Sequence, residues 1–257
     1  GNLSWARNKV LKMTEDANVP DYKRATGGPM GRYWGFVADG LFQSEEEIAH
    51  SAVFGPTLPG DIKLKDINGD GKITWDQDMV PIGRSNTPEM MFGLNLGAEW
   101  KGFDFNIHFQ GAGQSAYFIN GPAVYAFSNG DWGNILNDWA EPGNRWISSE
   151  ISGNPATENP NAKYPRLSYG GNSNNYRNST FWLRDGSYLR LKTLEVGYTF
   201  PQKWTNKLRM TKARLYFLGN NLAVWDSLDL WDPELASGDG MKYPLSKSFT
   251  LGLNVTF

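Results

Sequence analysis

The chain has no cysteine and only two histidines among its 257 residues. Without cysteine it can form no disulfide, no thiolate metal site and no cysteine nucleophile, and two histidines leave little room for histidine chemistry. Its 25 Lys and Arg residues against 27 Asp and Glu residues give a formal net charge of −2. This balance removes any bulk electrostatic argument for binding nucleic acid. We therefore expect neither an enzyme nor a nucleic-acid-binding protein.

Long hydrophobic runs are missing as well. No 18 apolar residues stand together, which excludes a membrane-spanning helix. The opening residues Gly1–Arg7 do not form a secretory signal, so we expect that any such signal was removed or lay upstream. A membrane-spanning β-strand needs only about 10 residues of alternating hydrophobicity. The low mean hydropathy of −0.51 is therefore compatible with a membrane-spanning β-barrel.

Aromatic residues and glycine are abundant, with 11 Trp, 11 Tyr, 14 Phe and 29 Gly. This composition is typical of β-structure. Segments in which every second residue is apolar predict five strands with one dry face and two weaker candidates. The five are residues 89–100, 103–111, 193–200, 212–220 and 248–257, and the weaker ones are about 2–13 and 29–37. Leu189 and Leu191 are out of phase with the rest of their strand, which predicts a bulge near Lys192.

The connections between these strands alternate in length. Residues 101–102 and 201–210 form short links, whereas 38–88, 114–185 and 224–247 form long ones. Short and long links then fall at opposite ends of the strands. Such sorting is typical of an up-and-down outer-membrane barrel with short periplasmic turns and long extracellular loops.

The dry face has two possible interpretations. It faces lipid in a barrel, and then Asp104, His108, Gln110, Glu195 and Arg214 on the other face line a wet lumen. In a soluble β-sandwich the dry face is core and the polar face is simply exposed. Aromatic residues near the short links favour the membrane, because they resemble an interfacial girdle. They are Trp100, Phe103, Tyr198, Phe200, Trp204 and Phe257.

Several blocks of sequence, in the same order along the chain, resemble the SusC/RagA family of TonB-dependent outer-membrane transporters. One block runs from Gly60 to Thr74 and continues to Pro81–Gly83. The other blocks are Tyr33–Gln43, Phe92–Leu96, Lys101–Asp104, Phe109–Gly111, Ser187–Lys192 and Gly197–Pro201. The resemblance covers nearly the whole chain.

The resemblance implies an all-β chain that forms the C-terminal section of a large transmembrane barrel, with residues 248–257 as its terminal strand. Seven strands are too few to close such a barrel, and family members resemble plugged barrels of about 22 strands. The plug and the remaining strands are therefore expected from another part of the same transporter. The resemblance also implies import of oligosaccharides or peptides with a SusD-like surface lipoprotein, energised through TonB.

One motif carries explicit site chemistry. Residues 66–74 match the first nine places of an EF-hand-type calcium loop, with side-chain oxygens at places 1, 3 and 5, glycine at 6 and a backbone carbonyl at 7. Place 12 is Gln77. Relative to the family pattern one residue is inserted, which favours Asp78 as the closing ligand. The candidate ligands of a structural Ca²⁺ are Asp66, Asn68, Asp70, Lys72, Asp76 and Asp78. The alternative is a series of turns without metal.

The long links are rich in aromatic residues, which suit sugar rings when amides and carboxylates stand beside them. They are Trp132, Trp139, Trp146, Tyr164, Tyr169 and Tyr176, and in the last link Trp225, Trp231 and Tyr243. For most of them we favour packing within the loops. Asp138 and Glu141 are not positioned as a glycosidase pair by anything in the sequence.

Two other functions stay open at this point. A secreted, calcium-stabilised β-sandwich that binds carbohydrate would remain folded without detergent. A soluble hydrolase would have to cleave glycans as an isolated chain.

Overall fold

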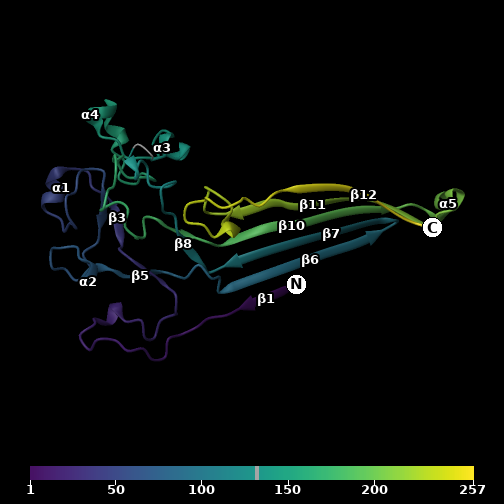
Figure 1. Cartoon of the computed structure of the whole chain (residues 1–257), viewed down its shortest axis with the longest axis horizontal. Coiled ribbons are helices and arrows are strands. Elements are labelled where there is room, and N and C mark those ends of the chain that lie inside the picture. The colour runs from purple at the N-terminus through teal and green to yellow at the C-terminus, as the bar shows by residue number, and fades with distance from the viewer. Residues whose placement is uncertain (131–132) are drawn as a thin grey trace.

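The computed structural model describes residues 1–130 and 133–257, and its main element is a six-stranded antiparallel sheet in the order β1-β6-β7-β10-β11-β12. The sheet forms one long layer, with most of the remaining chain gathered at one end (Figure 1). Its strands are β1 (Asn2–Trp5), β6 (Met90–Trp100), β7 (Phe103–Gly113), β10 (Tyr188–Thr199), β11 (Lys212–Asp226) and β12 (Ser248–Thr256). The all-β fold class is therefore confirmed.

The alternating segments form strands because each places its apolar side chains on one face in register with its neighbours. β6 and β7 make a hairpin in which Trp100 lies opposite Phe103. The two-residue turn places Lys101 and Gly102 at φ +47° and +88°. The bulge at Lys192 is confirmed, because the register of β10 against both neighbours shifts between Leu191 and Thr193.

One of the seven predicted strands does not belong to this sheet. The candidate at 29–37 shortens to β2 (Tyr33–Gly35), which pairs with β5 (Val80–Gly83) in a separate two-stranded sheet. The candidate at 2–13 forms only β1, which pairs with β6. The main sheet thus has six strands in the described part of the chain, and the prediction of a strand in the sheet at 29–37 was wrong.

Short and long connections lie at opposite ends of the sheet, as expected (Figure 1). At the short end, α5 (Gln202–Thr205) and η4 (Asn206–Leu208) form the turn between β10 and β11. The long connection between β11 and β12 holds η5 (Pro233–Leu235). Among the described helices, none has the length and apolar character to cross a membrane.

Residues 33–88 and 114–187, which we name the loop domain, fold together at the long-connection end (Figure 1). The 3-10 helix η1 (Asp21–Lys23) precedes the loop domain in the chain. The elements of the loop domain itself are short. They are β2, β3 (Ala38–Leu41), α1 (Glu45–Ala49), β4 (Ile62–Leu64), α2 (Trp75–Asp78), β5, β8 (Ala116–Phe118), α3 (Asn137–Ala140), α4 (Ser149–Ser152), η3 (Pro155–Thr157) and β9 (Leu183–Asp185). β3 pairs with β4 and β8 with β9.

The buried hydrophobic core lies mainly in the loop domain and not against the sheet. Phe36, Ile62, Trp139, Tyr164 and Trp182 are buried together there. Two of the three long links therefore form one packed body with its own core, to which the third link adds Leu228, where the sequence patterns indicate only loops.

Candidate functional site: a two-faced sheet with a loop domain at one end

One face of the sheet is apolar and open to the outside. A row of apolar residues crosses four strands, because Val196 lies opposite both Phe105 and Phe217, and Phe217 lies opposite Leu251. All four side chains are exposed, and Leu251 retains 74% of its accessible surface. Contiguous apolar surface of this kind marks contact with lipid or with another protein. No other sheet covers this face in the described part of the chain, so the structure does not favour a sandwich.

Aromatic side chains form a band at the short end of the apolar face. The ring of Tyr198 lies 4.7 Å from that of Phe103 and 5.4 Å from that of Phe200, centroid to centroid. Phe200 in turn lies 6.4 Å from Trp204. Trp100 is exposed beside them, with the ammonium of Lys101 4.8 Å from its ring. This arrangement has the composition of an interfacial girdle.

The opposite face of the sheet is polar and carries an ion cluster near the short end. Arg214 Nε donates to Asp104 Oδ2 at 2.8 Å, and Arg214 Nη2 donates to Glu195 Oε1 at 2.6 Å. Further along, His108 Nδ1 lies 3.0 Å from Asn95 Oδ1. Of the residues predicted to share the polar face, Asp104, Glu195 and Arg214 are thus brought into contact.

A second ion cluster, which the sequence analysis missed, lies closer to the loop domain. Arg190 is only 2% exposed, and its guanidinium lies 2.5 Å from Asp232 Oδ1 and 2.6 Å from Glu234 Oε2. Gln110 Nε2 also donates to Glu234, at 3.3 Å. Both acids stand at η5, so the last long connection folds back over the polar face. The sequence signal for this cluster is that Arg190 stands between Leu189 and Leu191, which places its side chain on the face of the strand opposite to theirs.

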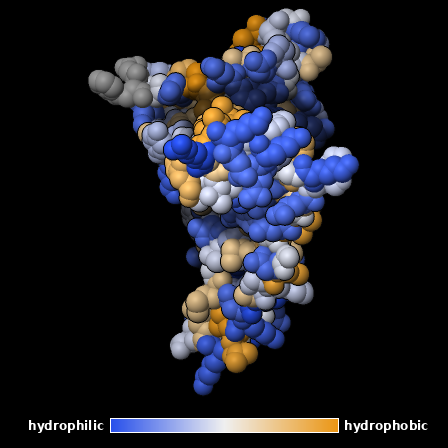
Figure 2. Space-filling model, turned by 90° about the vertical axis from the view of Figure 1, so that its right-hand side faces the viewer, coloured by the Kyte–Doolittle hydropathy of each residue, from blue (hydrophilic) through white to orange (hydrophobic). Residues whose placement is uncertain are grey.

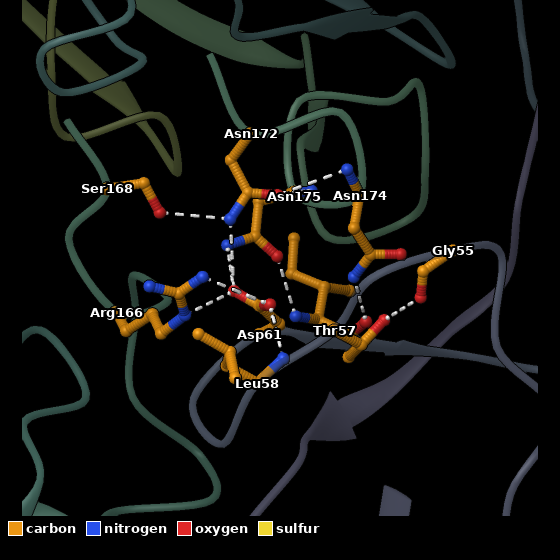
Figure 3. Close-up of polar contacts among 10 residues, drawn as sticks. Gly55, Thr57, Leu58, Asp61, Arg166, Ser168, Asn172, Asn174 and Asn175 are labelled. Atoms are coloured by element: carbon orange, nitrogen blue, oxygen red, sulfur yellow. Dashed lines mark hydrogen bonds and ion pairs between the residues drawn. The ribbon is translucent and has the colours of Figure 1, made fainter. Parts of the chain in front are cut away.

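Asp61 is the polar centre of the loop domain (Figure 3). Its side chain is 1% exposed, and its Oδ1 accepts hydrogen bonds from Arg166 Nε at 2.7 Å and Asn175 Nδ2 at 2.8 Å. Asn172 Nδ2 donates to the same oxygen at 3.1 Å, and the Leu58 amide donates to Oδ2 at 2.9 Å. The four donors satisfy the hydrogen-bonding needs of this buried carboxylate.

The asparagines around Asp61 also bind the adjacent backbone. Asn175 Oδ1 accepts from the Ile62 amide at 2.8 Å, and Asn174 Nδ2 donates to the Ile62 carbonyl at 2.9 Å. Residues 58–62 are thereby joined to residues 166–175, which lie more than 100 positions along the chain. The cluster holds the two long links in one fixed arrangement.

The candidate calcium loop is a compact turn. Asp66 accepts the amides of Gly69 and Gly71, each at 2.7 Å. Asn68 Nδ2 donates to Asp70 Oδ2 at 2.9 Å, and this hydrogen bond together with one from the Lys72 amide holds the pKa of Asp70 below its usual range. Gly71 adopts φ +81°, which suits the glycine required at place 6. The side chains at places 1, 3 and 5 therefore lie together.

The far end of the loop is closed by hydrogen bonds that Asp78 accepts. This residue ends α2 and is buried, with one carboxylate oxygen accepting the Ile67 amide at 2.8 Å and the other the Thr74 amide at 2.7 Å. Asp76 is exposed on the same helix. No group of three or more His, Asp or Glu side chains placed to hold a metal occurs among the described residues. A bound Ca²⁺ would therefore rely on Asn68 and on backbone oxygen as well as carboxylates.

The candidate calcium loop is packed against the rest of the loop domain through Trp75. Its ring lies 5.1 Å from Phe36 and 5.7 Å from Phe54 in edge-to-face contacts. The guanidinium carbon of Arg177 lies 3.4 Å from the Phe54 centroid and 4.9 Å from that of Trp75. Burial lowers the pKa of Arg177. Through Trp75, the loop at 66–78 thus contacts Phe54 in its own long link and Arg177 in the link at 114–185.

Most aromatic residues considered for sugar contact are packing residues. Trp139 and Tyr164 are fully buried and stack with centroids 4.4 Å apart, and Trp146 is also buried. Burial raises the pKa of Tyr176 to about 12, and its hydroxyl donates to the Ala126 carbonyl at 2.8 Å. Trp132 lies outside the described residues. Tyr169, Trp225 and Tyr243 remain exposed.

Asp138 has a structural role in this aromatic cluster. Its Oδ2 accepts from Lys163 Nζ and from the Tyr164 hydroxyl, each at 2.6 Å, and Asn144 Nδ2 donates to its Oδ1 at 2.9 Å. Burial acts to raise the pKa of Asp138, but the bonds from Lys163 and Tyr164 outweigh it, so the pKa lies below its usual range. Glu141 is exposed and is not among these partners.

Comparisons with known proteins identify the relatives of the chain, although no family model matches it. It is 34% identical to TonB-dependent receptor P26 of Formosa agariphila over 232 residues, which cover 85% of this chain and 22% of the receptor. It is 23% identical to TonB-dependent receptor SusC of Bacteroides thetaiotaomicron, over 100% of this chain and 24% of SusC.

A solved structure of the RagAB peptide importer in its closed-closed state has the same fold. It aligns with a TM-score of 0.66 and 21% identity, over 98% of this chain and 26% of the importer chain. The chain thus spans about a quarter of the length of the relatives it matches. It belongs to the SusC/RagA family of TonB-dependent outer-membrane transporters and corresponds to the C-terminal part of its members.

Proposed function

We propose that the sheet forms part of the wall of a plugged outer-membrane barrel that imports oligosaccharides or peptides. The observation that carries this proposal is the sheet with one apolar, exposed face and one polar, charged face. The apolar face would contact hydrocarbon and the polar face, with its Arg214 and Arg190 clusters, would line the lumen.

The edges of the sheet support a larger barrel. In the described part of the chain, β1 and β12 each pair with a neighbour on one side only. An unpaired strand edge in hydrocarbon leaves backbone groups without hydrogen bonds, at a cost of several kcal/mol per group. The missing strands and the plug would come from the rest of the same transporter, which would also carry the contact with TonB.

The loop domain would lie on the extracellular side and seat a SusD-like surface lipoprotein. Its packed core and its Asp61 cluster give it the fixed shape that a docking surface needs. One structural neighbour is a peptide importer, so we keep peptide beside oligosaccharide as a substrate class.

We propose a structural Ca²⁺ at residues 66–78. Asp66, Asn68, Asp70 and the Lys72 carbonyl would hold it, with Asp76 or Asp78 as the closing ligand. The ion would stiffen the loop that carries Trp75, and through Phe36, Phe54 and Arg177 it would stabilise the outer part of the loop domain.

Two measurements on the complete transporter test this function. Single cysteines replace Ala156 in the loop domain and Asn206 at the short end, both of which are exposed, and intact cells are treated with a membrane-impermeant maleimide. We expect labelling at position 156 alone, and labelling at 206 in intact cells would contradict the orientation.

Deletion of the transporter should abolish the TonB-dependent uptake of one class of substrate, oligosaccharide or peptide. Unchanged uptake of both classes would contradict the function.

A further inference from the structure

An apolar groove of about 370 Å³ lies at the short end of the sheet, between the α5–η4 turn and strands β11 and β12. The turn folds back toward the sheet, and Phe200 and Thr205 help to line the space between them. Its other main lining residues are Trp204, Leu208, Met210, Leu215, Leu253 and Val255. The groove is therefore a hydrophobic slot and not a polar subsite.

The groove is continuous with the apolar face of the sheet. Leu215 and Leu253 lie directly opposite each other across β11 and β12, and both are exposed. On the turn, Trp204 and Leu208 are exposed as well, and Leu208 retains 68% of its accessible surface. The groove thus opens where the apolar face ends, beside the aromatic band of Phe103, Tyr198 and Phe200.

The same turn is strongly basic. Lys203, Lys207 and Arg209 are exposed, and none forms an ion pair with another residue that the structure describes. From Val196 to Trp225 the sequence contains no Asp or Glu. Trp204 and Leu208 both line the groove, and Lys203 and Lys207 directly precede them in the sequence. Figure 2 faces this end of the molecule and shows hydrophobic residues bordered by hydrophilic ones.

We propose that the groove is a binding site for one anionic glycerophospholipid. An acyl chain lies in the groove against Leu208, Leu215 and Leu253, and the phosphate lies at the level of Lys203, Lys207 and Arg209. This inference rests on the proposed placement of the apolar face in the membrane. Charge and geometry favour a lipid over a soluble ligand, because the groove opens onto the lipid-facing surface and the turn that lines it carries the charge complementary to a phosphate.

Each lysine near an anionic lipid surface contributes about a fivefold gain in affinity. The bound lipid would hold the turn against the barrel wall and place the aromatic band at the level of the headgroups. It would also give the transporter a preference for membranes rich in anionic phospholipid, which a purely hydrophobic belt does not give.

Photocrosslinking tests the site in the complete transporter reconstituted into vesicles. Phosphatidylglycerol or phosphatidylcholine with a diazirine in one acyl chain is added as the probe, and labelled peptides are mapped by mass spectrometry. We expect phosphatidylglycerol to label residues 200–215 at least fivefold more than phosphatidylcholine does. Lys203→Gln with Lys207→Gln should remove this preference, whereas the control Lys9→Gln with Lys12→Gln, at two exposed lysines elsewhere, should retain it.

A Leu208→Gln variant separates the groove from the charge, because it should lower labelling by both lipids. Equal labelling by the two lipids in the wild-type protein would overturn the proposal, and so would labelling that no variant changes. Membrane fractionation is done first. A wild-type protein absent from the outer membrane would overturn the proposed function itself, whereas a correctly located protein with unselective labelling would overturn only the lipid site.

Discussion

Leu251 of β12 lies directly opposite Phe217 of β11, and both side chains are exposed, at 74% and 37% of their accessible surface. The next residue toward the start of β12, Thr250, points to the other face and lies opposite Leu218. Two adjacent positions of one strand therefore report on the two faces of the sheet. This makes β12 the best place to test which face contacts lipid.

Leu251→Arg in the complete transporter should destabilise the folded barrel by about 2–4 kcal/mol if position 251 lies near the bilayer midplane, because a charge there must leave water. Thr250→Arg is the matched control, since its side chain would enter the wet lumen, and it should cost less than about 1 kcal/mol. Urea unfolding in lipid vesicles measures both. Equal stabilities of the two variants would contradict the assignment of the faces.

Asp61→Asn should loosen the loop domain. The substitution removes the charge that Arg166 requires and weakens the hydrogen bonds from Asn172 and Asn175, at a cost of about 2–3 kcal/mol. Limited proteolysis of the complete transporter should then cut residues 114–185 faster than in the wild type. Asp39→Asn, at an exposed carboxylate, is the control. Unchanged cleavage in Asp61→Asn would rule out a central role for Asp61.

Acid should weaken the Trp139–Tyr164 cluster through Asp138. Because its pKa in the fold lies below the usual 3.8, Asp138 contributes stability above that value and loses the contribution as the pH falls through its lowered pKa. The contribution is below about 1 kcal/mol, because Asp138 and Lys163 are partly exposed. Pepsin cleavage followed from pH 4 to pH 2 should rise less steeply in Asp138→Asn. Glu141→Gln should follow the wild type, and identical profiles for all three proteins would contradict this role.

Calcium should stabilise the segment at 66–78. If the site binds with the affinity typical of extracellular modules, a concentration of about 100 times Kd adds about 2.7 kcal/mol. Protease protection of this segment should increase with CaCl₂ and reverse with a chelator in the wild type, and Asp70→Asn should abolish the response. Asp39→Asn again serves as the control. A wild-type protein without any calcium response has a loop held by its own hydrogen bonds alone, which is the metal-free alternative.

Much of the sheet could be predicted from the sequence, because a strand with two different faces has a local signature of period two. The out-of-phase leucines Leu189 and Leu191 even located the bulge at Lys192. The candidate at 29–37 failed because only Tyr33–Gly35 is extended, and its partner β5 belongs to the loop domain. Short strands paired over long distances have no such periodicity.

The contacts between residues far apart in the chain could not be predicted in this way. Asp61 and Arg166 are 105 residues apart in the chain, and Arg190 meets Asp232 and Glu234 across a folded connection. Such contacts depend on tertiary packing, which leaves no regular spacing in the sequence. The candidate calcium loop was found because its ligands are close in sequence, whereas the packing of Trp75 on Phe36 and Phe54 required the structure.

In the complete transporter, the apolar face of the sheet should contact hydrocarbon and the polar face should contact water. The chain has no cysteine, so spin labels on single cysteines at 250, 251, 253 and 254 are unique within it. In the complete transporter in vesicles, collision rates with oxygen and with a water-soluble nickel complex are measured at each position. We expect oxygen collisions to dominate at 251 and 253 and nickel collisions to dominate at 250 and 254. Equal access of nickel to all four positions would contradict this expectation.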